Sequence, residues 1–456
     1  MTAPISPLVA VDDEELLTGW GRTSPSRARV VHAQRAEDIT AAVKERNARG
    51  VLARGLGRSY GDAAQSGGAT VIDMTGVSGF SLDAASATVR ADGGASLDAI
   101  LRAIVPQGFF VPVSPGTRFV TVGGAIAADI HGKNHHVDGS FGAHVRSLDL
   151  LMADGHLRTL TPETTPEEFW ATVGGMGLTG IIVGATFSVI PIETSLISVD
   201  TERGSDLDDV MARMLARDDD YRYTVAWIDS VAASGRGVIT RGDHALRDQL
   251  PPAKRAQALA YNPPVRATAP SIIPSGLLNS WTVRAFNETW YRKHPVQRDG
   301  ELQPIAGFFH PLDGVQEWNR VYGPRGFLQY QFVVPDAASE VVRTSLERLA
   351  RAGAPSFLTV LKRFGPGDPG PLSFPMPGWT LAADVPARVE GLDRVLDELD
   401  ELVAAAGGRL YLAKDSRQSP QMVRRTYPRL ADWQAVRDRM DPDRVFTSDL
   451  ARRLEL

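Results

Sequence analysis

Two glycine-rich segments, residues 53–62 and 121–136, constrain what this chain can fold into more than any other feature. The first follows a short apolar strand predicted at residues 51–53, and the second opens with a run of small residues at 121–128. Glycine and other small residues let the backbone come close to a phosphate group, which exposed amides can then bind. We therefore expect both segments to be loops around a phosphate-bearing cofactor.

The first segment differs from the turn of a Rossmann dinucleotide-binding fold. That turn needs the spacing G-x-G-x-x-G and a helix directly after it. Here Gly55, Gly57 and Gly61 have one spacer too many, and residues 63–68 show no helical period. A plain turn between strands would explain the glycines alone. It would not explain the hydrogen-bond donors and the aromatic ring beside them, which come from Arg54, Arg58, Ser59 and Tyr60.

Length and composition narrow the class of protein. A chain of 456 residues exceeds the ~250–300 residues at which a single hydrophobic core stops growing, so we expect two domains. The formal net charge of -5 gives no basic field, and we expect no nucleic-acid partner. The absence of cysteine excludes disulfides, thiolate metal ligands and a cysteine nucleophile. No signal peptide or transmembrane helix is expected, because no apolar run is long enough.

The apolar pattern predicts an α+β protein. Helices are expected at three places, namely 36–50, 96–108 with Ser96 as the N-cap, and 392–403. Strands are expected where apolar residues alternate or cluster, at 71–74, 109–113, 327–334, 357–362 and 378–384. A hairpin is expected at Asp154-Gly155, a loop or lid in the proline-rich stretch 251–274, and a charged helix-like segment around 441–446.

The second glycine-rich segment ends in imidazole and ammonium groups, at His131, Lys133, His135 and His136. His131 and His135 have the i, i+4 spacing of metal ligands, but no H-E-x-x-H pattern or thiolate supports a metal, and we predict none. A solvated loop is a second interpretation. We rank first a polar wall beside the cofactor.

These motifs resemble those of a known family. The paired loops, residues 169–180 and the ending at 441–446 are similar to the vanillyl-alcohol oxidase/p-cresol methylhydroxylase FAD superfamily, on its aldonolactone and alditol oxidase side. More narrowly, five segments resemble the actinobacterial decaprenylphosphoryl-β-D-ribose 2′-oxidases, namely 131–136, 327–332, 371–375, 412–417 and 451–456. The resemblance covers nearly the whole chain.

The resemblance implies a two-domain FAD-binding fold of the p-cresol methylhydroxylase type, with a substrate or cap domain built on an antiparallel sheet. The FAD-binding domain would span residues 1–194 and the substrate-binding domain 195–408, and residues 409–456 would return to the FAD-binding domain. The positions matched to FAD are Ala53, Arg54, Gly55, Leu56, Gly57, Arg58, Ser59, Tyr60, Gly61, Asp62, Gly116, Thr117, Thr121, Val122, Gly123, Gly124, Ala128, Asp129, Ile130, His131, Ile182 and Tyr411.

The resemblance also implies a reaction, in which FAD accepts a hydride from the ribose C2′ carbon while a base removes the hydroxyl proton. The product would be the 2′-keto sugar, halfway through an epimerisation to decaprenylphosphoryl-D-arabinose for cell-wall arabinan. Lys414 is either that base or a cationic anchor for the lipid phosphate or a sugar hydroxyl. His131 and Tyr60 are further catalytic candidates. The positions matched to the substrate are Gln329, Gln331, Lys362, Thr380, Ala382 and Lys414.

Two positions depart from the family pattern. The family often has Asn and Cys where this chain has Thr380 and Ala382. The shorter polar group at 380 puts one ligand contact in doubt. Ala382 lacks the thiol that reactive nitroaromatic inhibitors modify, so we expect no covalent trapping, whereas oxidation should persist because hydride transfer needs no thiol.

The implied partners are a polyprenyl-phosphoryl pentose as substrate and a separate NADH-dependent keto-reductase. We also expect the protein at the cell envelope, in peripheral contact with the plasma membrane. Its side of the membrane, cytoplasmic or periplasmic, stays open. The region 251–278, with Ile272, Ile273, Leu277 and Leu278, would admit the lipid tail or touch the membrane, or is an ordinary flexible loop. Two rival functions stay open: a soluble alditol or aldonolactone oxidase, and a flavin-binding module without turnover.

Arg58 yields a prediction about the cofactor linkage. Many superfamily members attach FAD through a histidine at the place where this chain has Arg58, and arginine cannot form that bond. Acid precipitation of the yellow protein should therefore release the flavin into the supernatant, measured by its absorbance. Colour that stays in the pellet would contradict non-covalent binding.

Overall fold

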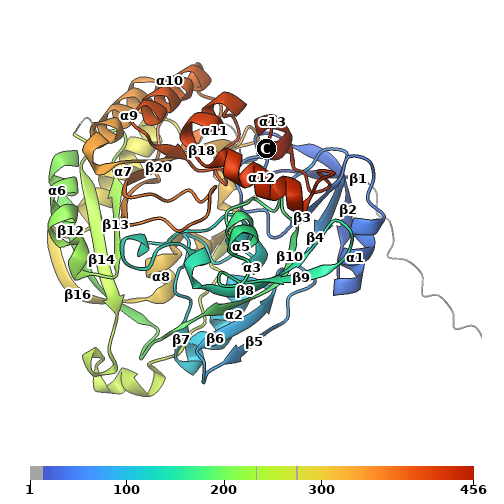
Figure 1. Ribbon diagram of the computed structural model, residues 1–456. Coiled ribbons are helices and arrows are strands. Elements are labelled where there is room, and N and C mark those ends of the chain that lie inside the picture. The colour runs from blue at the N-terminus through green and yellow to red at the C-terminus, as the bar shows by residue number, and fades with distance from the viewer. Residues whose placement is uncertain (1–13, 233, 274–275) are drawn as a thin grey trace, which may run out of the picture.

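Three main sheets organise the chain in the computed structural model, which describes residues 14–232, 234–273 and 276–456 (Figure 1). The first is mixed and has the order β1 (Glu14–Leu17), β2 (Ser26–His32), β4 (Thr70–Asp73) and β3 (Val51–Arg54). The second is antiparallel and has the order β5 (Phe80–Asp83), β6 (Thr88–Asp92), β10 (Ile181–Ser188), β8 (Val145–Leu151) and β9 (Leu157–Leu160).

Five helices accompany these two sheets, α1 (Ala36–Lys44), α2 (Leu97–Ile104), α3 (Val122–Ala127), α4 (His135–Asp138) and α5 (Pro166–Thr172). The Ser96 hydroxyl accepts a hydrogen bond from the Ala99 amide and caps α2, as its sequence predicts. α1 ends at Lys44, so the expected boundary at residue 50 is wrong. Gly50 instead has a φ of +90° in the turn before β3, and a Cβ there would lie 2.4 Å from the Val445 carbonyl oxygen.

The third sheet has eight strands, and every pair in it is antiparallel. Its order is β16 (Gln297–Pro304), β12 (Leu196–Gly204), β14 (Gly237–His244), β13 (Tyr223–Ile228), β19 (Thr359–Phe364), β20 (Gly378–Pro386), β18 (Phe327–Val334) and β21 (Arg409–Leu410). The predicted antiparallel sheet is therefore confirmed, and the fold is α+β. The domain limits at 194/195 and 408/409 stay a prediction; β21 still pairs with β18 just after residue 408.

The two faces of the large sheet have different neighbours. Apolar side chains of one face pack against three helices, α6 (Leu207–Arg217), α9 (Glu340–Arg351) and α10 (Leu392–Ala405). The opposite face contributes Tyr223, Val333 and Phe364 to the core that it shares with the second sheet. Alternation along each strand therefore divides its residues between a helix-covered face and a face that meets the N-terminal half of the chain.

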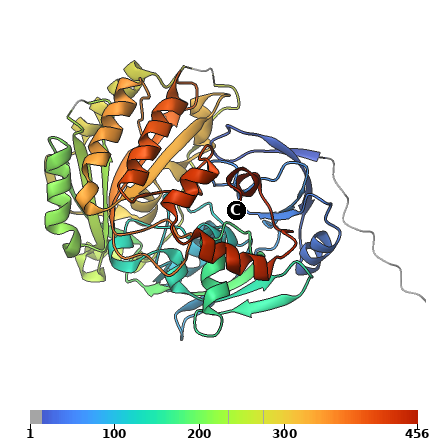
Figure 2. The ribbon, with the colours of Figure 1, turned by 45° about the horizontal axis from the view of Figure 1, so that its top comes forward.

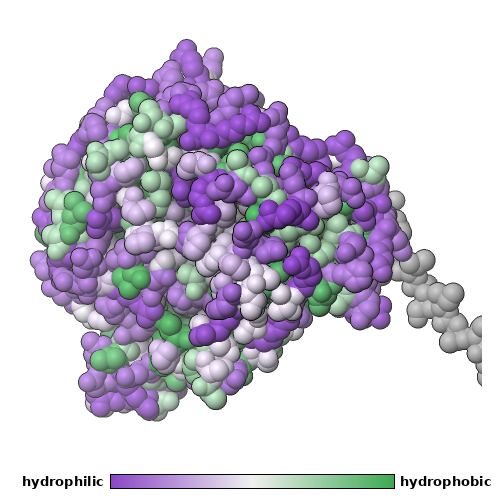
Figure 3. Space-filling view, viewed as in Figure 1, coloured by the Kyte–Doolittle hydropathy of each residue, from purple (hydrophilic) through white to green (hydrophobic). Residues whose placement is uncertain are grey.

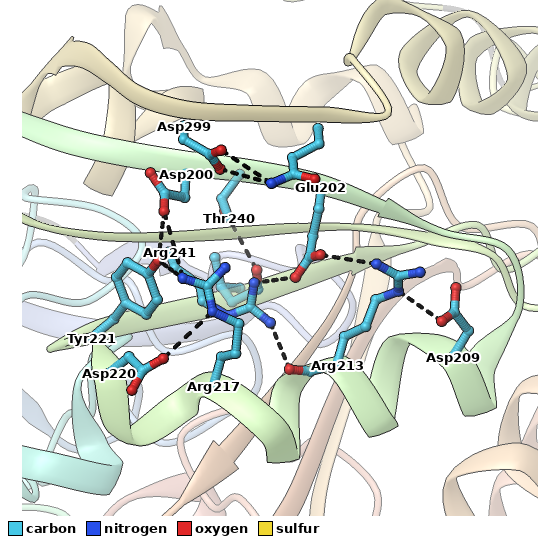
Figure 4. A network of polar contacts seen from close by, with 12 residues as sticks. Asp200, Glu202, Asp209, Arg213, Arg217, Asp220, Tyr221, Thr240, Arg241 and Asp299 are labelled. Carbon is cyan, nitrogen blue, oxygen red and sulfur yellow. Dashed lines mark hydrogen bonds and ion pairs between the residues drawn. The ribbon is translucent and has the colours of Figure 1, made fainter.

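A charged network ties the helix-covered face to α6 at the far edge of the sheet (Figure 4). Arg241 of β14 is 1% exposed, pairs with Glu202 of β12 and donates to the Arg213 carbonyl of α6 at 2.8 Å. Arg213 also pairs with Glu202 at 3.0 Å and with Asp209 at 2.7 Å. A buried guanidinium needs such partners, so this network fixes α6 on the sheet.

The C-terminal segment carries α11 (Pro420–Thr426), α12 (Leu430–Met440) and α13 (Asp449–Leu454), coloured red where they lie between the two halves of the molecule (Figure 2). The expected helix around 441–446 is wrong, because Pro442 follows Asp441 in a turn between α12 and α13. The Asp441 carboxylate accepts hydrogen bonds from the Val445 and Phe446 amides instead, and Phe446 bridges to Val51 of β3.

The remaining elements complete the fold. They are β7 (Phe109–Phe110), β11 (Ile190–Pro191), β15 (Ala267–Thr268), β17 (Val315–Gln316), α7 (Ser280–Lys293) and α8 (Ile305–Phe309). The strand expected at 109–113 is thus only two residues long, and the hairpin at Asp154-Gly155 is confirmed by the pairing of β8 with β9. Residues 274–275 of the predicted proline-rich loop lie outside the described part.

No helix in the described part of the chain is long and apolar enough to cross a membrane. The face shown in Figure 3 is mainly hydrophilic, with apolar side chains in small separate patches.

Candidate active site

The inner face of strands β18, β19 and β20 collects the polar residues that the sequence assigns to the substrate. In the strand register Gln329 lies opposite Asp384, Gln331 opposite Ala382, and Lys362 opposite Thr380. Residues at alternate positions of a strand share one face, so these side chains form three adjacent rows. The neighbouring residues Tyr330, Leu361, Leu381 and Ala383 belong to the apolar core on the other face.

His131 joins this sheet face to the second glycine-rich segment. Its Nδ1 atom lies 3.1 Å from the Lys362 Nζ atom, and its Nε2 atom lies 3.0 Å from the Gln331 amide. Burial and the Lys362 charge hold the pKa of His131 well below its usual value, so the ring is neutral. When Lys362 is an ammonium group it can only donate to Nδ1, so the ring proton then belongs on Nε2 and Gln331 turns its amide oxygen toward it.

Lys414 and Tyr60 meet at the other end of the same face. The Lys414 Nζ atom lies 3.7 Å from the centroid of the Tyr60 ring, and the Tyr60 hydroxyl lies 3.3 Å from the Gln329 amide nitrogen. The Gln329 amide also donates to the Asp384 carboxylate. Tyr60 is brought there by the backbone, since its amide donates to the Ala413 carbonyl at 2.9 Å. Sequence positions 60, 329, 384 and 414 therefore form one polar group.

Three lysines in and beside this site can lose their charge near neutral pH. Burial lowers the pKa of Lys362 to about 7, and burial together with the Lys362 charge lowers the pKa of Lys133 to about 7. Burial also lowers the pKa of Lys414 to about 7, with Lys362 adding to this effect and Asp384 opposing it. The site thus combines a surplus of basic groups with low solvent access, which suits both proton abstraction and anion binding.

The two glycine-rich loops are in direct contact. A Cβ on Gly55 would lie 2.2 Å from the Thr121 hydroxyl, and a Cβ on Gly61 would lie 1.8 Å from the Asp415 carbonyl oxygen. Gly57 has a φ of +62°, which favours glycine. Gly55 and Gly61 are therefore required for packing of protein on protein, whatever else they contact.

Free backbone amides mark where a phosphate-bearing group fits. Among the described residues, no acceptor is found for the N–H groups of residues 56–59 and 116–117. A Cβ on Gly116 would meet no atom within 4 Å, so the chain is open on that side. Unpaired amides of two adjacent loops suit the pyrophosphate of FAD, and the predicted residues are consistent with that cofactor.

The two arginines of the first loop already form contacts within the protein. Arg54 donates to the Ala64 carbonyl at 2.5 Å and to the Thr18 carbonyl at 2.8 Å, so it holds the loop in shape. Arg58 donates to the Phe119 carbonyl at 3.2 Å and lies over the Trp20 ring, 3.8 Å from its centroid. Burial lowers the pKa of both guanidinium groups.

Asp129 connects the second loop to the substrate side. Its carboxylate accepts hydrogen bonds from Ser140 at 2.7 Å, from the Gly142 amide at 2.9 Å, and from Ser373. Ser140 also contacts the Asp368 carboxylate at 2.8 Å, and burial together with Asp368 raises the pKa of Asp129 well above its usual value. Asp129 therefore holds together, by hydrogen bonds, segments that lie far apart in the sequence.

The remaining predicted flavin contacts lie around α3 and Tyr411. Thr121 caps α3 by accepting from the Gly124 amide at 3.2 Å, and a Cβ on Gly123 would lie 3.4 Å from the Ile182 carbonyl oxygen. Tyr411 donates to the Ala128 carbonyl at 2.9 Å and lies 5.5 Å from the His131 ring. The cofactor and substrate assignments of these residues stay predictions.

Sequence reasoning missed Asp384. The residue was visible only as the polar end of a strand that otherwise reads Gly378-Trp-Thr-Leu-Ala-Ala. Its position opposite Gln329 could be found only from the register of β18 with β20. The sequence places Lys133 in the basic cluster but indicates no role for it; in the structure its ammonium group packs against the Phe308 carbonyl and ring.

No group of three or more His, Asp or Glu side chains within the described ranges is arranged to hold a metal ion.

Comparison with known proteins gives a consistent class. A family model described as an FAD binding domain matches residues 27–161, and one described as D-arabinono-1,4-lactone oxidase matches residues 386–454. The chain is 48% identical over 449 residues to the decaprenylphosphoryl-β-D-ribose oxidase of Mycolicibacterium smegmatis, covering 96% of this chain and 97% of that protein.

More distant relatives match over most of their length. The chain is 24% identical to the alditol oxidase of a Streptomyces species, over 96% of this chain and 98% of that protein. It is also 24% identical to the L-gulono-1,4-lactone dehydrogenase of Mycobacterium tuberculosis, over 91% of this chain and 92% of that protein.

The fold, the paired loops and these matches define an FAD-dependent oxidoreductase of the vanillyl-alcohol oxidase type. Within that class, the chain belongs to the decaprenylphosphoryl-β-D-ribose oxidase family.

Removal of one buried ammonium group should stabilise the fold. The folded-state pKa of Lys362, about 7, lies below its ordinary value of 10.5, so the unfolded chain binds more protons between these pH values. Lys362→Met should therefore raise the free energy of unfolding by about 1–4 kcal/mol below pH 7, and this gain should shrink as the pH rises toward 10.5.

Denaturant titration at several pH values, with FAD in excess, measures this difference. The exposed Lys254→Met variant is the matched control and should change the free energy of unfolding by less than ~0.5 kcal/mol. A Lys362→Met protein that is less stable than the wild type at low pH would show that the buried ammonium group is favourably paired.

Proposed function

We propose that this protein oxidises the 2′-hydroxyl of a polyprenyl-phosphoryl ribose to the ketone, as the first half of its epimerisation to the arabinose form. The family membership supports the substrate class, because the Mycolicibacterium smegmatis relative is named for decaprenylphosphoryl-β-D-ribose. The observation that carries the proposal is the position of Lys414, a buried amine with a pKa of about 7 beside Tyr60 and the first glycine loop.

FAD, held by the two glycine-rich loops, supplies the hydride acceptor when bound. Lys414 is the proposed base, because near pH 7 a substantial fraction of its side chain is a neutral amine that can accept the hydroxyl proton. Tyr60 has a pKa raised well above its usual value by burial, so it stays a neutral donor that orients the sugar hydroxyl. Proton abstraction and orientation thus belong to different side chains.

His131 and its neighbours are proposed to hold the sugar. Neutral His131 is fixed between Lys362 and Gln331, which leaves the Lys362 ammonium to bind an oxygen of the substrate. Lys133 adds a second basic group on this side. An anionic phosphate nearby would favour the charged forms of both lysines, so substrate binding itself would supply the charge that burial opposes.

The ketone product requires a second enzyme to return a hydride to the opposite face of C2′. We propose that an NADH-dependent keto-reductase consumes it, and that both reactions take place at the cell envelope beside the plasma membrane. A lipid-linked product favours this arrangement, because it stays in the membrane while it passes between two enzymes.

Lys414→Ala should slow anaerobic reduction of the flavin by polyprenyl-phosphoryl ribose by ~10²–10⁴-fold at saturating substrate, because it removes the general base. Rapid mixing followed at the flavin absorbance measures this rate. The exposed Lys44→Ala variant, at the end of α1, is the control and should keep the wild-type rate. An unimpaired rate in Lys414→Ala would leave Lys414 as an anchor only.

The same measurement separates the rival functions. Free pentitols and lactones should reduce the wild-type flavin far more slowly than the lipid-linked ribose. Fast reduction by free sugars with formation of peroxide would indicate an alditol or aldonolactone oxidase, and a flavin that stays oxidised with every sugar would indicate a module without turnover.

We propose that the membrane contact involves exposed apolar side chains in the segment before α7 and in its first turn. Ile272 is 88% exposed, Leu277 52% and Trp281 81%. Arg388 lies beside them, since its guanidinium donates to the Leu278 carbonyl at 2.7 Å. Apolar and aromatic residues next to a cation suit the interface of an anionic bilayer.

Replacing Ile272 and Trp281 together by Ser should lower co-sedimentation with phosphatidylglycerol-rich vesicles several-fold, because the inserted apolar area is lost. The exposed Leu157→Ser variant, on strand β9, is the control. Equal sedimentation of all three proteins would exclude this surface as the membrane contact.

A further inference from the structure

Asp384 is the only carboxylate on the site-facing positions of β18, β19 and β20, and the reaction proposed above gives it no part. Its side chain is fully buried, at 0% exposure. One carboxylate oxygen accepts the hydrogen bond from Gln329, whereas the other is buried and has no hydrogen-bond partner in the described part of the chain. Burying an unpaired carboxylate oxygen lowers the stability of the fold, so a functional reason for Asp384 should be sought.

Asp384 and Lys414 are connected through the same two side chains. Gln329 contacts both the Asp384 carboxylate and the Tyr60 hydroxyl, and the Lys414 ammonium lies over the Tyr60 ring. In this water-poor site the two opposite charges act strongly on each other. Burial raises the pKa of Asp384 to about 7, and the charge of Lys414 opposes this rise. Asp384 in turn opposes the fall in the pKa of Lys414.

The other titratable groups around this pair cannot replace Asp384. Tyr60 and Tyr322 have pKa values raised well above the usual value by burial, and His131 has a pKa lowered well below it, so all three stay uncharged. Lys362 is a cation that disfavours a second one at Lys414. Asp415, adjacent to Lys414 in the chain, is paired with Arg453 at 2.9 Å.

We propose that Asp384 is a positioning residue that sets the protonation state of Lys414 and stabilises the ammonium group formed there during the reaction. This role rests on the proposed function of Lys414 as the base. When the substrate is oxidised, its O–H bond breaks and an N–H bond forms at Lys414, while the C2′ hydrogen leaves with its electron pair to the flavin and a C=O bond forms. The Asp384 carboxylate balances the positive charge that this proton brings into the site.

The first test measures Lys414 without any substrate. Competitive acetylation by acetic anhydride over a series of pH values, read by mass spectrometry, follows the neutral fraction of the Lys414 amine in the FAD-loaded protein. In Asp384→Asn, which keeps an acceptor for Gln329 but loses the charge, Lys414 should titrate about one pH unit lower than in the wild type. Asp384→Glu should restore the wild-type titration. An unmoved titration in Asp384→Asn would overturn the proposal.

The second test measures the reaction. The anaerobic rate of flavin reduction by polyprenyl-phosphoryl ribose should rise with pH in the wild type. In Asp384→Asn its midpoint should move about one unit lower and its plateau should fall about tenfold, because a weaker base accepts the proton less readily. Asp384→Glu should restore the midpoint.

A rate that falls equally at all pH values, with an unmoved midpoint, would mean that Asp384 only supports the fold, and would overturn the proposal. The two tests also separate this inference from the proposed function. Asp384→Asn could shift the pH titration of Lys414 while the flavin of Lys414→Ala is still reduced at the wild-type rate. Lys414 would then not be the base, and Asp384 would have no role in the reaction.

Discussion

The contact between the first glycine loop and the C-terminal segment is the constraint on which the site depends. The Tyr60 amide donates to the Ala413 carbonyl, and Gly61 lies so close to the Asp415 backbone that a Cβ would be 1.8 Å from its carbonyl oxygen. This backbone contact places Tyr60 under Lys414 and against Gln329 of the large sheet. Three segments from the beginning, middle and end of the chain therefore meet at one point.

The same closeness explains the electrostatics of the site. Packing that excludes water opposes charge on Lys133, Lys362 and Lys414, so their amines approach neutrality near pH 7. In the proposed reaction, stability and function are opposed here, because the buried basic groups that would serve the chemistry and bind an anionic substrate destabilise the fold. Asp384 is the acidic group that counters this excess on the sheet face.

Much of the fold could be predicted from local signals. Ser96 capped its helix, the Asp154-Gly155 hairpin formed, and alternation located β18 and β20, because each depends on a few neighbouring residues. Boundaries set by distant contacts were missed. The first helix ends at Lys44, well before the turn at Gly50 beside Val445, and Asp441 binds two amides in a turn where a helix was expected.

The sequence by itself determined the class of protein, since glycine spacing argued against a Rossmann turn and the motifs of the two halves identified the family, and Arg58 predicted a flavin without a histidyl bond at that position. Only the tertiary structure decided which residues share a site. Strand register put Asp384 opposite Gln329, and the C-terminal return put Lys414 over Tyr60. The physical reason is that side-chain type is a local property, whereas the pairing of charges and the exclusion of water depend on segments hundreds of residues apart in the chain.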